Sequence, residues 1–238
     1  NAFYIDLSSQ VSLDERIKLF VSHQDLHEVD YLFSIGGDGT LLKTVTLVQD
    51  SGIPILGINT GRLGFLTSIA TKEIDGAIKA IMSGEFEIDT RTLLSLETKN
   101  NLFGNINYAL NEITLQKTDT SSMITIQVYL GDKFLNSYWA DGLIISTPTG
   151  STAYSLSCNG PIILPGSGNI IINPIAPHNL NVRPVVIPDN VELTLKIDGR
   201  TDNFLVALDS RSLSVPLSIE LKIKKSEHQI NLIRLKSY

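Results

Sequence analysis

Sulfur-containing and aromatic residues are scarce in this chain of 238 residues, which has one cysteine, two methionines and one tryptophan. The single cysteine, Cys158, excludes an intrachain disulfide and favours a reducing compartment, so we expect a cytoplasmic protein. Cys158 could act as a nucleophile, but no histidine lies near it in the sequence. A small buried thiol is the more common role of such a residue.

Long apolar runs and an excess of positive charge are also missing. No apolar run reaches the roughly 18 residues of a membrane helix, and no signal peptide is visible, so we expect no membrane partner. The formal net charge is −6, which argues against broad nucleic-acid binding because that requires a basic surface. A small anionic ligand is still compatible with this negative net charge, since clustered backbone N–H groups can hold a phosphate. The histidines show no metal-ligand spacing, and the sequence identifies no metal ligand.

Strand-like and helix-like segments alternate in the first third of the chain. We expect strands at residues 2–7, 31–35 and 53–58, and helices that begin near Ser12, Gly39 and Thr71. Two of these helices have apolar residues at helical spacing, which we expect to be buried: Leu41, Leu42, Val45 and Val48 in one, and Ile74, Ala77, Ile78 and Ile81 in the other. This alternation predicts an α/β domain over residues 1–85, with a parallel sheet.

The pattern changes after Gly84, where segments with period-2 alternation replace the helices. Residues 124–130, 191–197 and 218–224 are the clearest of these segments. We therefore expect a second, β-rich domain over residues 86–226. The apolar segment 230–235 predicts one more strand, which could return to either domain.

A glycine-rich turn, Gly36–Thr40, stands between a predicted buried strand and a predicted helix. Glycines there let backbone N–H groups point at a phosphate, and the helix N-terminus adds positive potential. Asp38 is a carboxylate inside this anion-binding loop, so it needs a hydroxyl proton or a metal to hold. That makes it a candidate general base or Mg²⁺ partner. The structural alternative is an ordinary strand-to-helix turn in which Asp38 is the N-cap.

Residues 147–161 are the most informative stretch of the sequence. They follow an apolar strand-like run and combine small hydroxyl residues, two glycines and one tyrosine. Such a segment lets the backbone approach a ligand closely and offers several hydroxyl donors. Together with the upstream glycine-rich turn, it predicts a nucleotide site built from two parts of the chain.

Other polar positions allow both a functional and a structural interpretation. Asn111-Glu112 lies between apolar stretches and suits recognition of a base edge and a ribose diol, although a hairpin turn is equally compatible. Asp141 is a ligand-binding carboxylate or a turn residue. Trp139 and Tyr154 could stack on a ring, but single aromatics more often belong to the core. We expect three basic side chains to be solvated: Lys117, Arg183 and Lys222.

These motifs together resemble those of the NAD kinase family, in the same order and at similar spacing. The resemblance covers Val29 to Val215 and rests on Gly36–Thr40, Asn59–Leu66 (NTGRLGFL), Asn111-Glu112, Asp141–Tyr154 (DGLIISTPTGSTAY) and Arg183-Pro184. The Gly-Gly-Asp-Gly-Thr turn alone is shared with diacylglycerol and sphingosine kinases. The run from Thr147 to Tyr154 is highly specific to NAD kinases.

The resemblance implies a fold and a reaction. The fold is that of NAD kinases and diacylglycerol kinases, with an α/β N-terminal domain, a β-rich C-terminal domain and residues 227–238 returning to the first domain. The reaction is transfer of a phosphoryl group from ATP, with a divalent metal such as Mg²⁺, to the 2′-hydroxyl of the adenosine ribose of NAD⁺. In the family a neighbouring subunit contributes to the site, which implies a homodimer or homotetramer here.

The resemblance also implies roles for individual residues. Asp38 approaches the 2′-hydroxyl as the catalytic residue, and Asp141 reaches the nicotinamide half from a neighbouring subunit. The phosphate loop for ATP consists of Gly36, Gly37, Gly39 and Thr40. The remaining NAD⁺ contacts are Gly39, Asn111, Glu112, Thr149, Thr152, Ala153, Tyr154, Ser157 and Ala176. Many family members carry Asp-Gly-Gln where this chain has Asp209-Ser210-Arg211, so the resemblance assigns no role to Asp209.

Two other functions compete with this one. A lipid kinase would share the glycine-rich turn but has no need of the segment from Asp141 to Tyr154. A nucleotide-binding regulator without catalysis would be favoured by the loss of Asp38 or Glu112, and both carboxylates are present. The sequence does not choose among ATP, another nucleotide and polyphosphate as donor, and it does not show whether NADH is accepted.

Overall fold

A computed structural model describes residues 26, 29–61, 64–67, 69–118, 122–179 and 181–236. The strand expected at residues 2–7 and the helix expected near Ser12 lie outside the described residues. The chain divides into two compact units, one of residues 1–90 and 229–238 and one of residues 91–228. We call them unit 1 and unit 2 and describe each by itself. The boundary predicted after residue 85 precedes strand β4, and the one predicted after residue 226 lies within strand β15.

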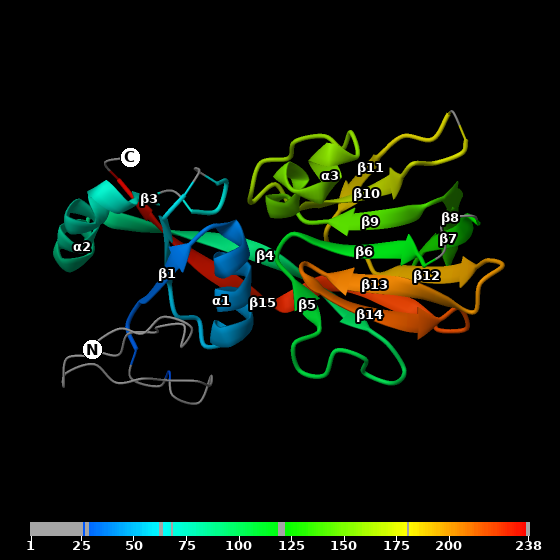
Figure 1. The fold of residues 1–238 in the computed structure, drawn as a ribbon, viewed down its shortest axis with the longest axis horizontal. Helices are drawn as coiled ribbons and strands as arrows, with labels where there is room; N and C mark the ends of the chain where they lie inside the picture. The colour runs from blue at the N-terminus through cyan, green and yellow to red at the C-terminus, as the bar shows by residue number, and fades with distance from the viewer. Residues whose placement is uncertain are drawn as a thin grey trace. The chain divides into compact units, whose positions relative to one another are not determined.

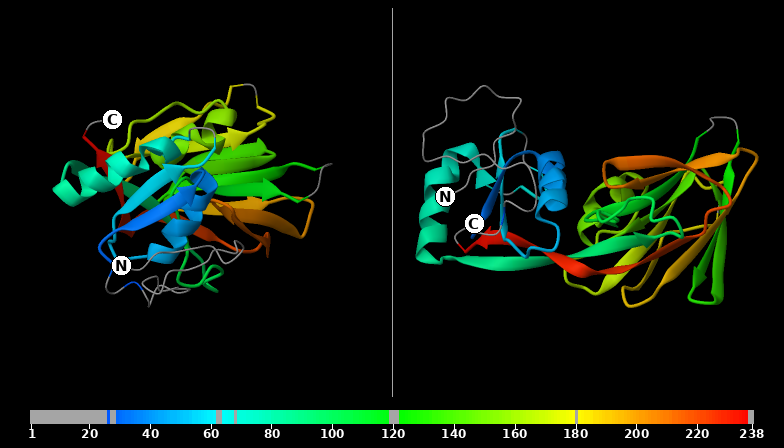
Figure 2. Two further views of the ribbon diagram at one scale, coloured as in Figure 1. Left: turned by 60° about the vertical axis from the view of Figure 1, so that its left-hand side comes forward. Right: turned by 90° about the horizontal axis from the view of Figure 1, so that it is seen from below.

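Unit 1 is an α/β unit built on a short parallel sheet (Figure 1). Strands β1, β2 and β3 pair in parallel, and β15 joins β2 in parallel at Leu232 and Ile55. Helices α1 and α2 lie on opposite sides of these strands (Figure 2). The elements are β1 (Leu32–Gly36), α1 (Asp38–Val48), β2 (Ile55–Asn59), β3 (Ile69–Ala70), the 3₁₀ turn η2 (Thr71–Glu73), α2 (Ile74–Ser83) and parts of β4 (Phe86–Glu97) and β15 (Leu221–Leu235).

The helix faces of unit 1 differ slightly from those expected. In α1 the buried residues are Leu41, Thr44, Val45 and Val48, so Thr44 takes the place predicted for Leu42. In α2 the buried stripe is Ala77, Ala80 and Ile81, which share one face at i, i+3 and i+4. Ile78 lies off that stripe and is 42% exposed, so its predicted burial was wrong. α2 ends at Gly84, whose φ of 75° suits the left-handed position after a helix.

The end of β15 contributes to the core of unit 1. Ile233 and Leu235 are buried in one apolar cluster with Leu56 and Ile58 of β2 and with residues of α2. The Lys236 N–H donates to the carbonyl of Glu85, which extends the contact beyond the strand. Segments from the two ends of the described chain therefore share one hydrophobic core.

Unit 2 is a β-rich unit of two sheets that enclose one core, which confirms the predicted fold class. One sheet has the order β11-β10-β9-β6-β13-β14, and the other contains β7, β8, β12, β4, β5 and β15. The strands not yet given are β5 (Tyr108–Ala109), β6 (Glu112–Lys117), β7 (Ile124–Leu130), β8 (Lys133–Ala140), β9 (Gly142–Ser146), β10 (Asn169–Ile175), β11 (Val185–Pro188), β12 (Leu193–Asp198), β13 (Asn203–Leu208) and β14 (Arg211–Pro216).

Alternation along the strands explains this core. Leu193, Leu195 and Ile197 of β12 point inward at every second position. β10 is different because Ile170, Ile171 and Ile172 are all fully buried. Those three residues therefore offer no apolar surface for association.

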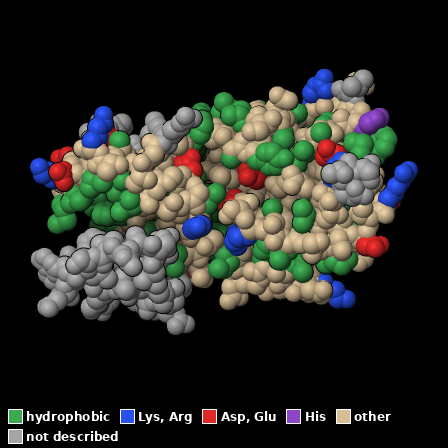
Figure 3. Space-filling model, viewed as in Figure 1, with side chains coloured by type: hydrophobic (Ala, Val, Ile, Leu, Met, Phe, Trp, Pro, Cys, Tyr) green, Lys and Arg blue, Asp and Glu red, His purple; other side chains and the backbone are tan. Residues whose placement is uncertain are grey.

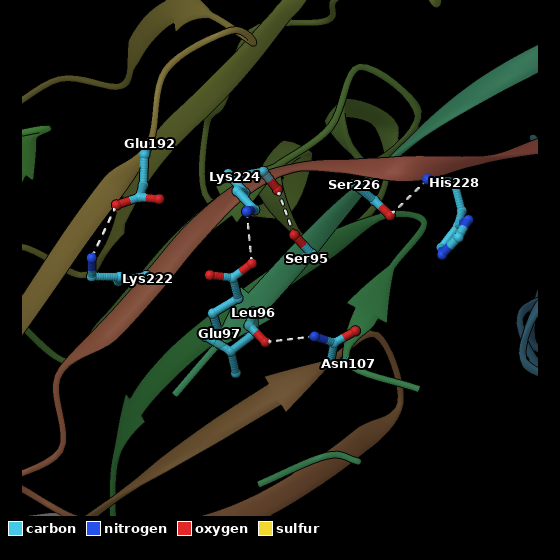
Figure 4. A network of polar contacts seen from close by, with 9 residues as sticks. All are labelled: Ser95, Leu96, Glu97, Asn107, Glu192, Lys222, Lys224, Ser226 and His228. Atoms are coloured by element: carbon cyan, nitrogen blue, oxygen red, sulfur yellow. Dashed lines mark hydrogen bonds and ion pairs between the residues drawn. The ribbon is translucent and has the colours of Figure 1, made fainter. Parts of the chain in front are cut away.

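Polar side chains bridge strands of the second sheet on its outer side (Figure 4). Lys224 of β15 pairs with Glu97 of β4 at 2.7 Å, and the Ser95 hydroxyl donates to the Lys224 carbonyl. Lys222, predicted to be solvated, is 46% exposed and pairs with Glu192 at 3.3 Å. Such exposed pairs contribute little free energy, about 0–1 kcal/mol each. The buried apolar side chains therefore supply most of the stability.

Candidate active site

Asp38 is bound by a loop that lies far from it in the sequence. It is the first residue of α1, and Gly37 is the N-cap, so the alternative in which Asp38 caps the helix is wrong. The backbone N–H groups of Phe65, Leu66 and Thr67 donate to its carboxylate at 2.9, 3.2 and 3.1 Å, and the Thr67 hydroxyl donates at 3.0 Å. Three of these bonds reach Oδ1 and one reaches Oδ2. Oδ2 accepts only the Phe65 N–H and can therefore accept one more donor.

A hydrogen-bond chain supports this arrangement from the sheet. Asn59, at the end of β2 and almost fully buried, donates through Nδ2 to the Thr67 hydroxyl at 2.9 Å. Because that hydroxyl is occupied as an acceptor, its proton points to Asp38. A side chain at Gly64 would place its Cβ only 2.2 Å from Asp38 Oδ1. The NTGRLGFL motif thus contains residues that hold Asp38 in one orientation.

The glycine-rich turn joins β1 to α1. Gly37, Gly39 and Thr40 are exposed. The Thr40 N–H donates to the Gly37 carbonyl at 2.9 Å, so the backbone donors available to a ligand are those that precede it in the first turn of the helix. Gly36 is required by contact, because a Cβ there would lie 2.2 Å from the Thr40 hydroxyl oxygen. The turn therefore presents backbone donors and a helix N-terminus, an arrangement suited to phosphate.

In unit 2, Asn111 and Glu112 form the turn that leads into β6, and both are buried. The Asp209 carboxylate accepts hydrogen bonds from the backbone N–H groups of Leu110, Asn111 and Glu112. Arg211 donates to the carbonyls of Ile106 and Tyr108. Asp209 and Arg211 have no role that could be predicted from the sequence. The only indication was the aspartate itself, which stands where many family members have Asp-Gly-Gln, although the two residues after it differ.

Glu112 has an unusual ionisation. Burial first, and the charge of Asp209 second, raise its pKa from 4.5 to about 8, against the opposing effect of a backbone hydrogen bond from Tyr154. Its Oε2 is buried without a hydrogen-bond partner among the described residues. The side chain is therefore protonated at neutral pH and can donate a hydrogen bond as well as accept one.

The hydroxyl-rich segment folds into a 3₁₀ turn, η3 (Thr149–Thr152), and a short helix, α3 (Tyr154–Ser157). Some of its hydroxyl groups already form hydrogen bonds within the protein. The Thr147 hydroxyl donates to the Leu110 carbonyl at 2.6 Å, and the Ser151 hydroxyl donates to the Pro148 carbonyl at 2.6 Å. Gly150 permits close approach, since a Cβ there would lie 2.1 Å from the Asn111 carbonyl oxygen. These contacts fix the segment against the Asn111–Glu112 turn.

The remaining candidates of this segment differ in accessibility. Thr149 is buried and accepts a hydrogen bond from Arg91 at 3.2 Å, and the Thr152 hydroxyl donates to the Thr149 carbonyl at 3.2 Å. Thr152 and Ala153 are partly buried, whereas Tyr154 and Ser157 are exposed. Burial raises the pKa of the Cys158 thiol, which disfavours the thiolate that a nucleophile requires.

Asp141 lies between β8 and β9 and pairs with Lys117 at 2.6 Å. The Lys117 side chain is only 18% exposed, so the prediction that it is solvated was wrong. The Asp141 N–H donates to the carbonyl of Ile175, the residue that precedes Ala176. Ala176 has a φ of 43°. Gln116 donates to the Tyr154 hydroxyl at 3.0 Å.

Trp139 is not a core residue. It is 45% exposed, and its ring packs against that of His178 with centroids 4.4 Å apart. Within unit 2, the contacts thus connect Asn111, Glu112, Thr149, Thr152 and Tyr154. Ser157 shares the short helix α3 with Tyr154. Asp38 and the glycine-rich turn are assembled within unit 1.

Comparison with known proteins agrees with this assembly of motifs. The model of the ATP-NAD kinase N-terminal domain matches residues 5–86, and that of the ATP-NAD kinase C-terminal domain matches residues 110–235. This chain belongs to the NAD kinase family. It phosphorylates NAD⁺ to NADP⁺, with ATP as a substrate. Membership of the NAD kinase family excludes the two competing functions, a lipid kinase and a nucleotide-binding regulator without catalysis.

Relatives of known name cover nearly the whole chain. The NAD kinase of Cytophaga hutchinsonii is 48% identical over 100% of this chain and 82% of its own length, and that of Flavobacterium psychrophilum is 52% identical over 94% and 77%. Two solved structures share the fold. Yeast NADH kinase, complexed with NADH, has a TM-score of 0.83 at 27% identity and covers 92% of this chain and 65% of its own.

The second solved structure is an NAD kinase from Archaeoglobus fulgidus in complex with ATP. Its TM-score is 0.79 at 28% identity, and the match covers 93% of this chain and 84% of the archaeal one. The described part of the chain has no helix with both the length and the apolarity that crossing a bilayer requires.

Proposed function

We propose that this NAD kinase family member transfers the γ-phosphoryl group of ATP to the 2′-hydroxyl of the adenosine ribose of NAD⁺, with Asp38 as the general base. The supporting observation is the Asp38 carboxylate, which is oriented by four hydrogen bonds and follows directly on an exposed glycine-rich turn. Phosphoryl transfer depends mainly on positioning and on electrostatic stabilisation. A carboxylate in fixed orientation can accept the hydroxyl proton as the oxygen attacks phosphorus.

Gly36, Gly37 and Gly39 would hold the phosphates of ATP through backbone N–H groups at the start of α1, and Thr40 through its side-chain hydroxyl, because its N–H donates to the Gly37 carbonyl. The archaeal relative, which was solved in complex with ATP, supports this binding of the donor. The described residues contain no group of three or more His, Cys, Asp or Glu that could hold a metal ion. The glycine-rich turn offers one carboxylate, Asp38, and this fits a Mg²⁺ ion that is held mainly by the nucleotide phosphates. The ion would neutralise the charge on the transferred group.

Asn111 and Glu112 would bind the adenosine part of NAD⁺. The Asn111 amide both donates and accepts, and the protonated Glu112 side chain does the same, so the pair matches a surface of mixed donors and acceptors. Tyr154, with its exposed ring, would pack against the ligand. Thr149, Thr152, Ala153, Ser157 and Ala176 complete the proposed NAD⁺ contacts.

We also propose that the protein works in the cytoplasm as a homodimer or homotetramer. Ile162 and Leu164 are 65% and 77% exposed, and their exposure supports an association surface on unit 2. On the face drawn in Figure 3, apolar side chains gather in small groups among polar ones. Asp141 would then serve the nicotinamide half of NAD⁺ bound by a neighbouring subunit.

The test is a kinase assay with purified protein, NAD⁺, ATP and Mg²⁺ in which NADP⁺ is measured. Asp38→Asn is expected to lower kcat by about 10²–10⁴-fold, the usual contribution of a general base. Asp75→Asn, the same change in the first turn of α2, is the matched control, because Asp75 is exposed. Circular dichroism and thermal denaturation establish that both variants fold. An Asp38→Asn variant that keeps more than about half of the kcat contradicts the role of Asp38.

A further inference from the structure

The turn at Asn111–Glu112 is fixed by one carboxylate from a distant part of unit 2. Asp209 directly follows β13, and its Oδ1 accepts from the N–H groups of Asn111 at 2.8 Å and Glu112 at 3.1 Å. Its Oδ2 accepts from the N–H of Leu110 at 2.9 Å. In return, the Asp209 N–H donates to the Glu112 carbonyl at 3.0 Å. Three successive peptide groups are therefore held by one side chain, through charge-assisted hydrogen bonds.

Arg211 fixes the approach to the same turn. Its guanidinium donates through Nη1 to the Ile106 carbonyl and through Nη2 to the Tyr108 carbonyl. The planar fork of arginine reaches two carbonyls at once, which a lysine ammonium cannot match geometrically. Asp209 holds the N–H groups of the turn, whereas Arg211 holds the carbonyl groups before it.

A tight hairpin explains how both side chains reach the turn. Leu208 of β13 pairs with Arg211 of β14, so Asp209 and Ser210 form a two-residue loop. Asp209 has a φ of 52°, a left-handed conformation that aspartate tolerates better than most residues. β13 also pairs with β6, the strand that begins at Glu112. The hairpin end is thereby placed beside the Asn111–Glu112 turn.

We propose that Asp209 and Arg211 are positioning residues for NAD⁺, which hold Asn111 and Glu112 in the binding conformation without contacting the ligand. This inference rests on the proposed function, in which Asn111 and Glu112 bind adenosine. A displacement of binding groups by about 1 Å can cost on the order of 100-fold in rate, so the backbone of this turn has to be fixed. A role in positioning also explains why the loop that connects β13 and β14 carries an aspartate and is followed by an arginine.

The experiment compares Asp209→Asn, Arg211→Met and Arg211→Lys in the full chain. The matched controls are Asp202→Asn, which lies before β13 and is exposed, and Arg200→Met, which is also exposed. Asp209→Asn and Arg211→Met are expected to raise the KM for NAD⁺ by about 10-fold, equivalent to about 1.4 kcal/mol. The KM for ATP should stay unchanged, and Arg211→Lys should fall between Arg211→Met and the wild type.

Amide hydrogen exchange without ligand provides a readout that is independent of the kinetics. Peptides containing residues 110–112 should exchange faster in the Asp209 and Arg211 variants, while peptides from β7 and β12 keep their protection. If Asp209→Asn does not fold, Arg211→Met and Arg211→Lys carry the same test. Unchanged exchange at residues 110–112, or an equal rise of KM for NAD⁺ and ATP, overturns the proposal.

Asn111→Ala separates this proposal from the proposed function. If Asn111→Ala raises the KM for NAD⁺ but the Asp209 and Arg211 variants do not, the positioning role is wrong and the adenosine contact stands. If the Asp209 and Arg211 variants raise the KM for NAD⁺ while neither Asn111→Ala nor Glu112→Gln has an effect, positioning through this turn is also wrong, because the turn then contributes no contact. An equal KM effect of all three changes, together with faster exchange, supports the proposal.

Discussion

Single residues show where the physical chemistry of this protein departs from the ordinary, and Glu112 is the clearest case. A carboxyl group that is buried beside another carboxylate, with Oε2 unpartnered among the described residues, favours its neutral form. The folded protein therefore binds the Glu112 proton more tightly than the unfolded chain does. This difference links the stability of the fold to pH.

Glu112→Gln should change how stability depends on pH. The pKa of Glu112 is about 8 in the folded protein against an ordinary 4.5, so its contribution is fully present below pH 4.5 and is lost as pH rises toward 8. Glutamine does not titrate. The unfolding free energy of Glu112→Gln minus that of the wild type should therefore increase from pH 5 to pH 8, by on the order of 2–4 kcal/mol.

Urea denaturation of both proteins across this pH range measures the difference directly. Glu97→Gln is the control, because Glu97 is an exposed partner of Lys224 and such pairs contribute little. A difference for Glu112→Gln that stays constant between pH 5 and pH 8 would show that Glu112 is not kept neutral by the fold.

The residue scale also shows the limit of sequence reasoning about the site. Asp38 could be recognised from its glycine-rich surroundings, because the chemistry there is local. The groups that bind it, at residues 65–67, are separated from it by 27–29 residues, and nothing in the sequence pairs them. The same holds for Lys117 with Asp141, and for Asp209 with the turn at Asn111. Local patterns identify candidate chemistry, whereas long-range hydrogen bonds become known only with the fold.

At the scale of elements, the sequence pattern located the helices α1 and α2 despite errors at single positions such as Ile78, but it divided the strand β15 in two. The segments 218–224 and 230–235 were predicted as separate strands, but β15 runs from Leu221 to Leu235 without a break. Its middle, Lys224 to His228, is polar and partly exposed, so no alternation marks it as a strand. β15 pairs with β4, β12 and β2, and these long-range pairings have no counterpart in the local sequence pattern.

The end of β15 should stabilise unit 1 selectively. Ile233 is 4% exposed and belongs to the apolar cluster of unit 1, so Ile233→Ala is expected to cost about 2–5 kcal/mol. Arg234→Ala, at the adjacent exposed position, is the matched control and should change stability by less than about 0.5 kcal/mol. Hydrogen exchange followed by peptide mass spectrometry locates the effect. Faster exchange confined to peptides from α2 and β2 is expected, and equal loss of protection in β7 and β12 would contradict it.

For the whole molecule, the open question is whether one chain suffices for activity. The composition could bound the number of domains and exclude disulfides, but it could not show an assembly. Asp141, at the start of the hydroxyl-rich region, is partly exposed and held by Lys117, while Trp139 two residues before it is exposed. A charged group and an exposed aromatic ring side by side suit a contact with a second copy of the chain. Closed symmetry would make that contact reciprocal.

Mixing two inactive variants tests the shared site. If Asp141 acts in the site of a neighbouring subunit, a mixed dimer of Asp38→Asn and Asp141→Asn contains one site with both aspartates intact and one site with neither. Random exchange at equal amounts makes half of the dimers mixed, so about a quarter of the wild-type activity should return, by the arithmetic of a symmetric dimer. Native mass spectrometry must show that subunits have exchanged, and a mixture of Asp38→Asn with the wild type controls for dilution. If the subunits exchange but no activity returns, or if a monomer is fully active at the assay concentration, Asp141 acts in the active site of its own chain.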